Sequence, residues 1–222
     1  MLTLAGLDQV VLAAFVAFCR IGGCFMLIPG FSSIRVPMNV RLFIAVAVSI
    51  ALLAHLWDSI VPLVDPRPVV LLPMIVSELL IGALIGLVAR FYVLALEFIG
   101  SVITMVSGYT ATPGISVEEP IAQSPLGALI SLTALLLLFL LGFHREVIAA
   151  LVTSYEVAPV NVFFDPQSAL TDLADTIAES FLVVLRLGSP FVAYGILVNL
   201  AAGFINRLAP QIPVYFISLP FV

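Results

Sequence analysis

The sequence contains no lysine, and charged residues of both signs make up only 9% of its 222 residues. An ordinary globular domain carries about 25% charged residues, so this chain cannot supply the polar exterior that a soluble fold of this size needs. The eight basic residues are all arginines and form no run, and the formal net charge is -5. Because nucleic-acid affinity rests on clustered cations, the sequence predicts no nucleic-acid partner.

Residues that bind metals or act as nucleophiles and bases are also scarce. Cys19 and Cys24 lie five residues apart in an apolar run, which is neither a CxxC pair nor a disulfide framework; we interpret them as buried thiols. His55 and His144 belong to no HExxH motif, and the sequence has no GxSxG motif or P-loop. An intramembrane enzyme would need a nucleophile and a base at a recognised spacing. We therefore predict no enzymatic activity, no cofactor and no metal.

What the sequence has in abundance is long apolar stretches, and 63% of its residues are hydrophobic. A helix needs roughly 20 apolar residues to cross a bilayer. This composition predicts an all-α, integral membrane-type fold with about six long apolar helices and an incomplete C-terminal element after Gln211. The predicted stretches are 10–29, 42–64, 69–96, 126–143, 147–164 and 177–205.

Proline-containing segments separate these stretches, as in PGFSSIRVPMN, VDPRP and DPQSALTDLADT. Proline prevents helix continuation and Gly and Ser supply turn conformations, so we interpret these segments as breaks. Within 168–179, apolar residues recur at helical spacing, which predicts a short amphipathic helix ahead of the last long one. The sequence has no internal repeat at a fixed period and no low-complexity segment, and nothing in it suggests a second domain. The chain is therefore predicted to form one helical domain, 1–222.

Four ionisable side chains lie inside apolar stretches: Arg20, Glu78, Arg90 and Arg186. Such a group in a membrane costs at least about 2.5 to 3.5 kcal/mol, so each needs a partner. Either they form a proton or ion relay, or each pairs with an opposite charge or a backbone carbonyl where helices meet. Because they are scattered along the sequence, pairing is the favoured interpretation.

Glu78, Gly82 and Gly86 are spaced i, i+4, i+8 and share one stripe of a helix. The two glycines make a GxxxG pattern that permits close helix approach. His144 lies where one apolar run ends and the next begins. It is interpreted as a helix-terminal residue bonded to backbone, and the alternative is a pH-sensitive group.

The segment 108–125, GYTATPGISVEEPIAQSP, carries three prolines and two adjacent glutamates between long apolar stretches. Non-helical backbone next to apolar spans is tolerated where protein buries it or where it lines a wet cavity. We therefore place it in or over a channel, with an ordinary solvent loop as the alternative.

Four stretches of the sequence carry a resemblance to a known family: FCRIGGCFMLIPGFSSIRVPMNVRLFIAVAVS, SELLIGALIGLVARF, LLFLLGFHREVIAALVTSYEVAPV and LRLGSPFVAYGILVNLAAGFINRLAPQIPVYFISLPF. They run through nearly the whole chain, and in sequence and order they resemble the family of the flagellar biosynthetic protein FliR, whose counterpart in virulence-type secretion is SctT. The chain departs from the family before the central loop, where Phe98-Ile99-Gly100 and Met105-Val106-Ser107 replace an Ala-Gly pair and a Gln.

The resemblance implies a structural and gating subunit of the flagellar type III export gate, built of helical hairpins. Its implied partners are FliP-like and FliQ-like subunits, with one copy of this chain per gate, other proteins of the export apparatus, unfolded export substrates and membrane lipid. The implied location is the bacterial inner membrane, within the flagellar basal body. The alternative is a self-sufficient small-solute transporter, although the sequence shows no symmetry between two halves.

The resemblance also singles out individual residues. It selects Arg20, Pro29, Pro37, Arg41, Glu78, Gly82, Gly86, His144, Arg186, Arg207, Pro210, Gln211 and Pro213. Among these and Arg90, we expect buried charges and interface contacts at Arg20, Glu78, Gly82, Gly86, Arg90, His144, Arg186 and Arg207. The family's pore plug falls on the central loop, with Gly108, Pro113, Gly114, Glu118 and Glu119 in that role. Family members usually continue beyond the equivalent of Phe221, so a shortened C-terminus is also expected.

Overall fold

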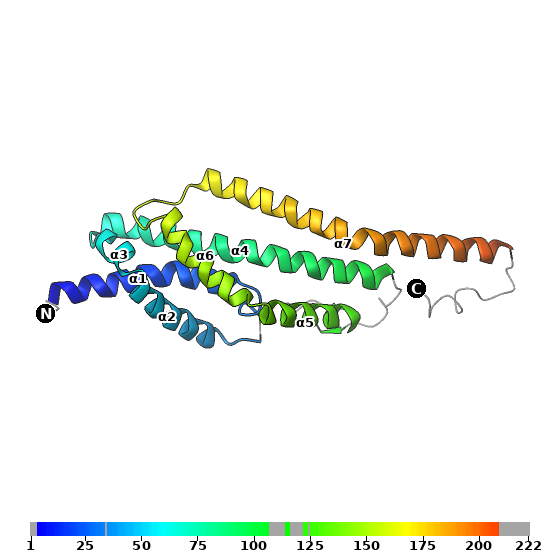
Figure 1. Cartoon of the computed structure of the whole chain (residues 1–222), viewed down its shortest axis with the longest axis horizontal. Coiled ribbons are helices and arrows are strands. Elements are labelled where there is room, and N and C mark those ends of the chain that lie inside the picture. The colour runs from blue at the N-terminus through cyan, green and yellow to red at the C-terminus, as the bar shows by residue number, and fades with distance from the viewer. Residues whose placement is uncertain (1–3, 34, 107–113, 116–121, 124, 209–222) are drawn as a thin grey trace. The chain divides into compact units, whose positions relative to one another are not determined.

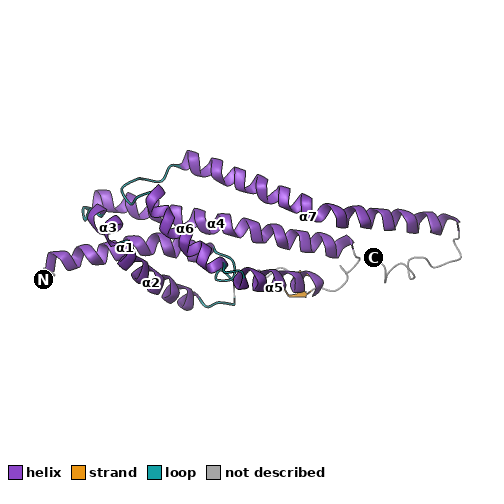
Figure 2. Ribbon diagram, in the orientation of Figure 1, coloured by secondary structure: helices purple, strands orange, loops and turns teal. Residues whose placement is uncertain are grey.

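The computed structural model describes residues 4–33, 35–106, 114–115, 122–123 and 125–208 (Figure 1). Within these residues there are six long helices (Figure 2), which confirms the predicted all-α class. They are α1 (Leu4–Leu27), α2 (Met38–His55), α4 (Pro68–Val106), α5 (Pro125–Leu140), α6 (Phe143–Val157) and α7 (Pro166–Leu208). The short helices α3 (Trp57–Ile60) and η1 (Val61–Leu63) follow α2, and two-residue strands β1 (Gly114–Ile115) and β2 (Ala122–Gln123) pair antiparallel.

The helix α4 is longer than predicted, because it continues ten residues beyond Leu96 to Val106. The polar residues of this extension do not break it. The Ser101 hydroxyl donates to the carbonyl of Phe98 at 2.7 Å, and the Thr104 hydroxyl donates to that of Gly100 at 2.7 Å. Hydroxyls that bond to the preceding turn of their own helix are satisfied without leaving it.

The break predicted at DPQSALTDLADT is wrong, because α7 begins within this segment at Pro166. Asp165 stands at the N-cap position, where its carboxylate accepts hydrogen bonds from the backbone N–H groups of Gln167 (3.1 Å) and Ser168 (3.2 Å). These bonds hold the pKa of the Asp165 carboxyl below its usual range. Proline is well tolerated in the first helical turn, so the predicted amphipathic segment is the continuous start of a 43-residue helix.

The chain divides into two compact units. Unit 1 comprises Met1–Phe91 and Leu136–Thr176, and unit 2 comprises Tyr92–Leu135 and Ile177–Val222. Both α4 and α7 contribute residues to each unit. The prediction of one domain stays a prediction.

Unit 1 has two clusters of buried apolar side chains, and both are built around α1. The first joins α1 to the end of α2, to α3 and to the N-terminal part of α4, and it includes Ala13, Val16, Leu53, Ile60 and Met74. The second joins the C-terminal half of α1 to α2 and α6 through Ile21, Cys24, Phe25, Ala45 and Leu151. Unit 2 has a smaller cluster on α4 and α7, formed by Ala95, Ile99 and Val184.

Within the described residues, four helical segments are long and apolar enough to cross a membrane: Asp8–Leu27, Met38–His55, Pro68–Val106 and Pro166–Leu208. The pair Gly127–Leu140 and Phe143–Val157 passes the same criterion jointly but is bent by 60°. The bend falls at Gly142, whose φ of 84° lies in the left-handed region that favours glycine. The chain is therefore a membrane-type protein.

Candidate functional site

The site is centred on a close contact between α1 and α4, which small residues permit. A Cβ atom added at Gly82 would lie 1.8 Å from the carbonyl oxygen of Arg20, and one at Gly86 would lie 2.6 Å from that of Cys24. From the opposite side, a Cβ at Gly23 would lie 2.7 Å from the carbonyl oxygen of Leu79. The two helices therefore meet backbone to backbone, which is the packing that small residues at i and i+4 allow.

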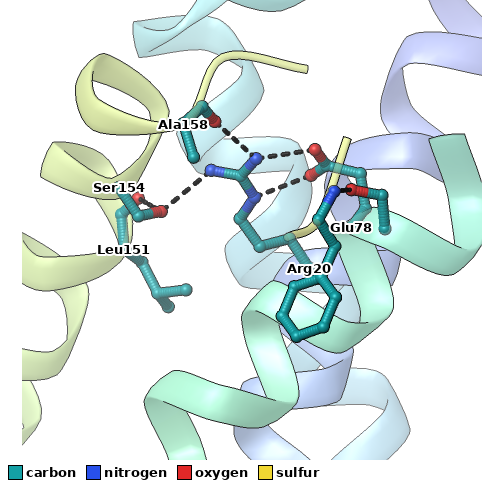
Figure 3. A network of polar contacts seen from close by, with 7 residues as sticks. Arg20, Glu78, Leu151, Ser154 and Ala158 are labelled. Carbon is teal, nitrogen blue, oxygen red and sulfur yellow. Dashed lines mark hydrogen bonds and ion pairs between the residues drawn. The ribbon is translucent and has the colours of Figure 1, made fainter. Parts of the chain in front are cut away.

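This contact brings Arg20 and Glu78 together as a buried ion pair (Figure 3). Arg20 Nε donates to Glu78 Oε2 at 2.7 Å, and Arg20 Nη2 donates to Glu78 Oε1 at 2.6 Å. Both side chains are 0% exposed. The parallel pair of bonds matches the guanidinium fork to the carboxylate, the geometry in which charge-assisted bonds are strongest.

The guanidinium also binds α6 and the residue that follows it. Arg20 Nη1 donates to Ser154 Oγ at 3.0 Å, and Nη2 donates to the carbonyl oxygen of Ala158 at 2.8 Å (Figure 3). The Ser154 hydroxyl donates in turn to the carbonyl of Leu151 at 2.7 Å. One side chain of α1 thus connects α4, α6 and the loop after α6.

Tyr155 covers the remaining face of the arginine. The Arg20 Cζ atom lies 3.9 Å from the centre of the Tyr155 ring, within range of a cation–π interaction. The ring is 3% exposed, and its hydroxyl has no hydrogen-bond partner among the described residues. The aromatic face, rather than the hydroxyl, is what the arginine uses.

A second connection lies one residue before Glu78. The buried Ser77 hydroxyl accepts a hydrogen bond of 2.7 Å from the backbone N–H of Phe164. The loop between α6 and α7 is therefore bound to α4 near its end at Phe164, and to Arg20 at its start through Ala158. The ion pair and this serine together position the start of α7 within unit 1.

This arrangement can hold helices in a fixed register. A buried ion pair adds little net stability over apolar residues, but removing one partner leaves an uncompensated charge and is strongly destabilising. The pair and the further bonds of the guanidinium connect α1 to α4 and α6. Among the described residues, no cluster of three or more His, Cys, Asp or Glu side chains could hold a metal.

The other predicted charged residues are not among the partners that the described residues give to Arg20 and Glu78. Arg90 is half-buried on α4, and Arg186 and Arg207 are exposed on α7. His144 is exposed near the start of α6, where its ring stacks on Phe139 at a centroid distance of 6.2 Å.

Arg41, which the resemblance also selected, has a local role. Its guanidinium donates to the carbonyl oxygens of Ser33 (2.5 Å) and Val36 (3.1 Å) in the loop between α1 and α2. Arg41 thus supplies hydrogen bonds to two carbonyl groups of this proline-containing loop, which lies between helices. Ser154, Tyr155 and Ala158 were absent from the sequence predictions, because a polar residue within a helix carries no signal of its long-range contacts.

Most of the predicted pore plug lies outside the described residues. This applies to Gly108, Pro113, Glu118 and Glu119, whereas Gly114 belongs to strand β1. Pro210, Gln211 and Pro213, with the predicted C-terminal element, also lie outside the described residues. Their assigned roles stay predictions.

Comparison with known proteins places the chain in a family. Residues 11–222 match the family described as Bacterial export proteins, family 1. The chain belongs to this family. The resemblance predicted from the four sequence stretches is thereby confirmed.

Curated relatives of this export protein come from both flagellar and virulence-type systems. It is 27% identical to the flagellar biosynthetic protein FliR of Caulobacter vibrioides, over 96% of the chain and 84% of that relative. It is 29% identical to FliR of Bacillus subtilis, over 94% and 80%. It is also 25% identical to Yop proteins translocation protein T of Yersinia pestis, over 90% and 77%.

Proposed function

We propose that this export protein is a structural and gating subunit of the flagellar type III export gate, where it assembles with FliP-like and FliQ-like subunits. One copy per gate would help to form the channel for unfolded flagellar subunits, in the inner membrane at the basal body. The observation that carries the proposal is the match to the export family over residues 11–222, together with relatives named FliR that align along most of the chain. The flagellar assignment is favoured over a virulence-type one because FliR of Caulobacter vibrioides (27%) and of Bacillus subtilis (29%) have higher identities to the chain than Yop proteins translocation protein T (25%).

The lengths of the two longest helices support assembly with protein partners. At 1.5 Å per residue, the 39 residues of α4 extend about 58 Å and the 43 residues of α7 about 64 Å. The hydrocarbon core of a bilayer is about 30 Å thick. Lipid alone would leave roughly half of each helix outside the hydrocarbon core. The start of α7 carries the exposed acids Asp172, Asp175 and Glu179 and suits water, whereas α4 is mostly apolar along its length, so other apolar protein is the better match for the remainder of α4.

The exposed surface of unit 2 supports the same conclusion. Large apolar side chains are exposed along the C-terminal half of α7, among them Phe191, Ile196, Leu197, Leu200 and Phe204. They occur around most of the circumference of the helix rather than along one stripe. A helix that is apolar all round is one that is buried on all sides. Neighbouring subunits or lipid would provide that burial.

A self-sufficient transporter, the other candidate, is not favoured. It would need an intramembrane site where ionisable groups face a substrate path. Arg20 and Glu78 instead form an ion pair with each other inside unit 1. The guanidinium also donates hydrogen bonds to Ser154 and to the carbonyl of Ala158. The two charged groups of this cluster are therefore already paired.

The gating part of the proposal rests on the segment 108–125, which we assign as a plug that closes the channel. Deletion of residues 112–119 should leave the complex assembled but make the closed channel leaky to ions. The proposal uses two features of the sequence: glycine adopts more backbone conformations than other residues, which a moving plug needs, and two adjacent glutamates suit a hydrated surrounding. Conductance of the purified complex in a planar bilayer measures the effect.

A matched control keeps the segment length and replaces residues 112–119 with a Gly/Ser sequence. We expect it to leak as well if the specific segment plugs the pore, and to stay closed if loop length alone is sufficient. Unchanged conductance in the deleted complex, with all subunits present, would count against the plug assignment. The assembly part of the proposal is tested by co-expression with FliP-like and FliQ-like subunits and purification through a tag on this chain.

A further inference from the structure

Unit 1 contains an open groove with an apolar floor and acidic edges. Its volume is about 370 Å³, and residues of α4, α6 and α7 line it. Its apolar lining comes from Leu84, Ile85, Val88, Ala89, Phe143, Val147 and Ala150. Among the described residues, the charged side chains that line it are Glu146 of α6 and Asp172 of α7.

Neither of these carboxylates has a cation partner within the part of the chain that the structure describes. Arg145 is next to Glu146 in sequence but does not line the groove, and its side chain lies beside Gly142 at the start of α6. Arg90 follows Ala89 on α4 and also does not line it. Two carboxylates from different helices therefore border an apolar surface with no arginine of this chain between them.

The two carboxylates make lipid a poor occupant of the groove. An acyl chain would cover the apolar lining but would leave Glu146 and Asp172 without a cation, and charged groups in contact with hydrocarbon are disfavoured unless they are paired. An apolar segment that carries a cation matches both the apolar lining of the groove and the two carboxylates at its edges.

We propose that this groove docks an apolar helix of a partner subunit, whose arginine or lysine side chain pairs with Glu146 and Asp172. The inference rests on the proposed export-gate assembly and adds where a partner binds and what it carries. The apolar floor supplies contact area, and the two carboxylates select a helix with a cation at the matching position. Complementary charge of this kind governs which partner binds and in what register.

Site-specific cross-linking in the co-expressed complex tests the inference. A benzophenone amino acid introduced at Ala150, a small exposed residue that lines the groove, reports what occupies it. The charge-reversal variant is Glu146→Lys with Asp172→Lys. The matched control is Glu156→Lys with Asp175→Lys, because these exposed acids lie on the same two helices, do not line the groove and produce the same change in net charge.

We expect a cross-link from position 150 to the FliP-like or FliQ-like subunit, in a peptide that contains Arg or Lys within an apolar helix. Charge reversal in the groove should lower its yield by about tenfold, because like charges would then face each other, and the control should leave it unchanged. A cross-link to lipid or to a second copy of this chain would overturn the inference. Equal yields in the two variants, or a cross-linked peptide without a cation, would also overturn it.

The experiment separates this inference from the assembly on which it rests. If the FliP-like and FliQ-like subunits co-purify but no cross-link forms at position 150, the groove assignment fails and the assembly stands. If those subunits do not co-purify even with the unmodified chain, both fail together.

Discussion

Replacing Arg20 with alanine should lower the free energy of unfolding by about 3 to 5 kcal/mol, because it leaves the carboxylate of Glu78 buried and uncompensated. The substitution removes four hydrogen bonds that connect α1 to α4, to α6 and to the loop after α6. It also removes the cation–π contact with Tyr155. Denaturant unfolding of the co-expressed, detergent-extracted complex, followed by circular dichroism, measures the change.

Two controls separate loss of charge balance from loss of packing. The double substitution Arg20→Met with Glu78→Leu removes both charges and keeps apolar bulk, so it should recover most of the lost stability. Arg67→Ala breaks the exposed pair with Asp65, which solvent screens, and should leave unfolding unchanged. The account is contradicted if Arg20→Ala unfolds at the same denaturant concentration as the unmodified protein.

Replacing Gly82 with alanine should lower the free energy of unfolding by about 3 kcal/mol, at the upper end of the range for overpacked sites. The added Cβ would lie 1.8 Å from the carbonyl oxygen of Arg20 and 2.7 Å from its carbonyl carbon. These are backbone atoms, so α1 and α4 must move apart. That movement would shift Arg20 relative to Glu78, so the substitution acts on the contact and on the ion pair together.

Gly22→Ala is the matched control, because Gly22 is also buried in α1 and borders Gly23. Its added Cβ would lie 3.5 Å from the Phe18 ring, which is ordinary contact, and alanine is the better helix former by about 0.5 to 1 kcal/mol. We expect Gly22→Ala to be neutral or stabilising in the same denaturant measurement. Equal effects of the two substitutions would show that the α1–α4 contact is looser than the account requires.

The helices could be predicted because long apolar runs interrupted by proline determine where a chain of this composition can be helical. Their ends could not be predicted equally well. The start of α7 depends on the carboxylate of Asp165 at the N-cap position, and there proline begins the helix instead of breaking it. The extension of α4 depends on hydroxyls that bond to its own turns. Both are local contacts that hydropathy does not detect.

Part of the site was also visible in the sequence. Arg20 and Glu78 stand out as charges within apolar runs, and Gly82 and Gly86 stand out by their i, i+4 spacing. Their pairing across 58 positions could not be deduced, because nothing local to Arg20 specifies which helix it meets. Ser154 and Tyr155 resemble ordinary polar and aromatic residues of an amphipathic helix, and only the folded chain shows that they surround the arginine.

The central claim is that this chain belongs to a multi-subunit export gate, and the native mass of the co-expressed, detergent-extracted complex tests it most directly. The account predicts a discrete complex that contains FliP-like and FliQ-like subunits and one copy of this chain. A stable, monodisperse species of this chain without those subunits would contradict it.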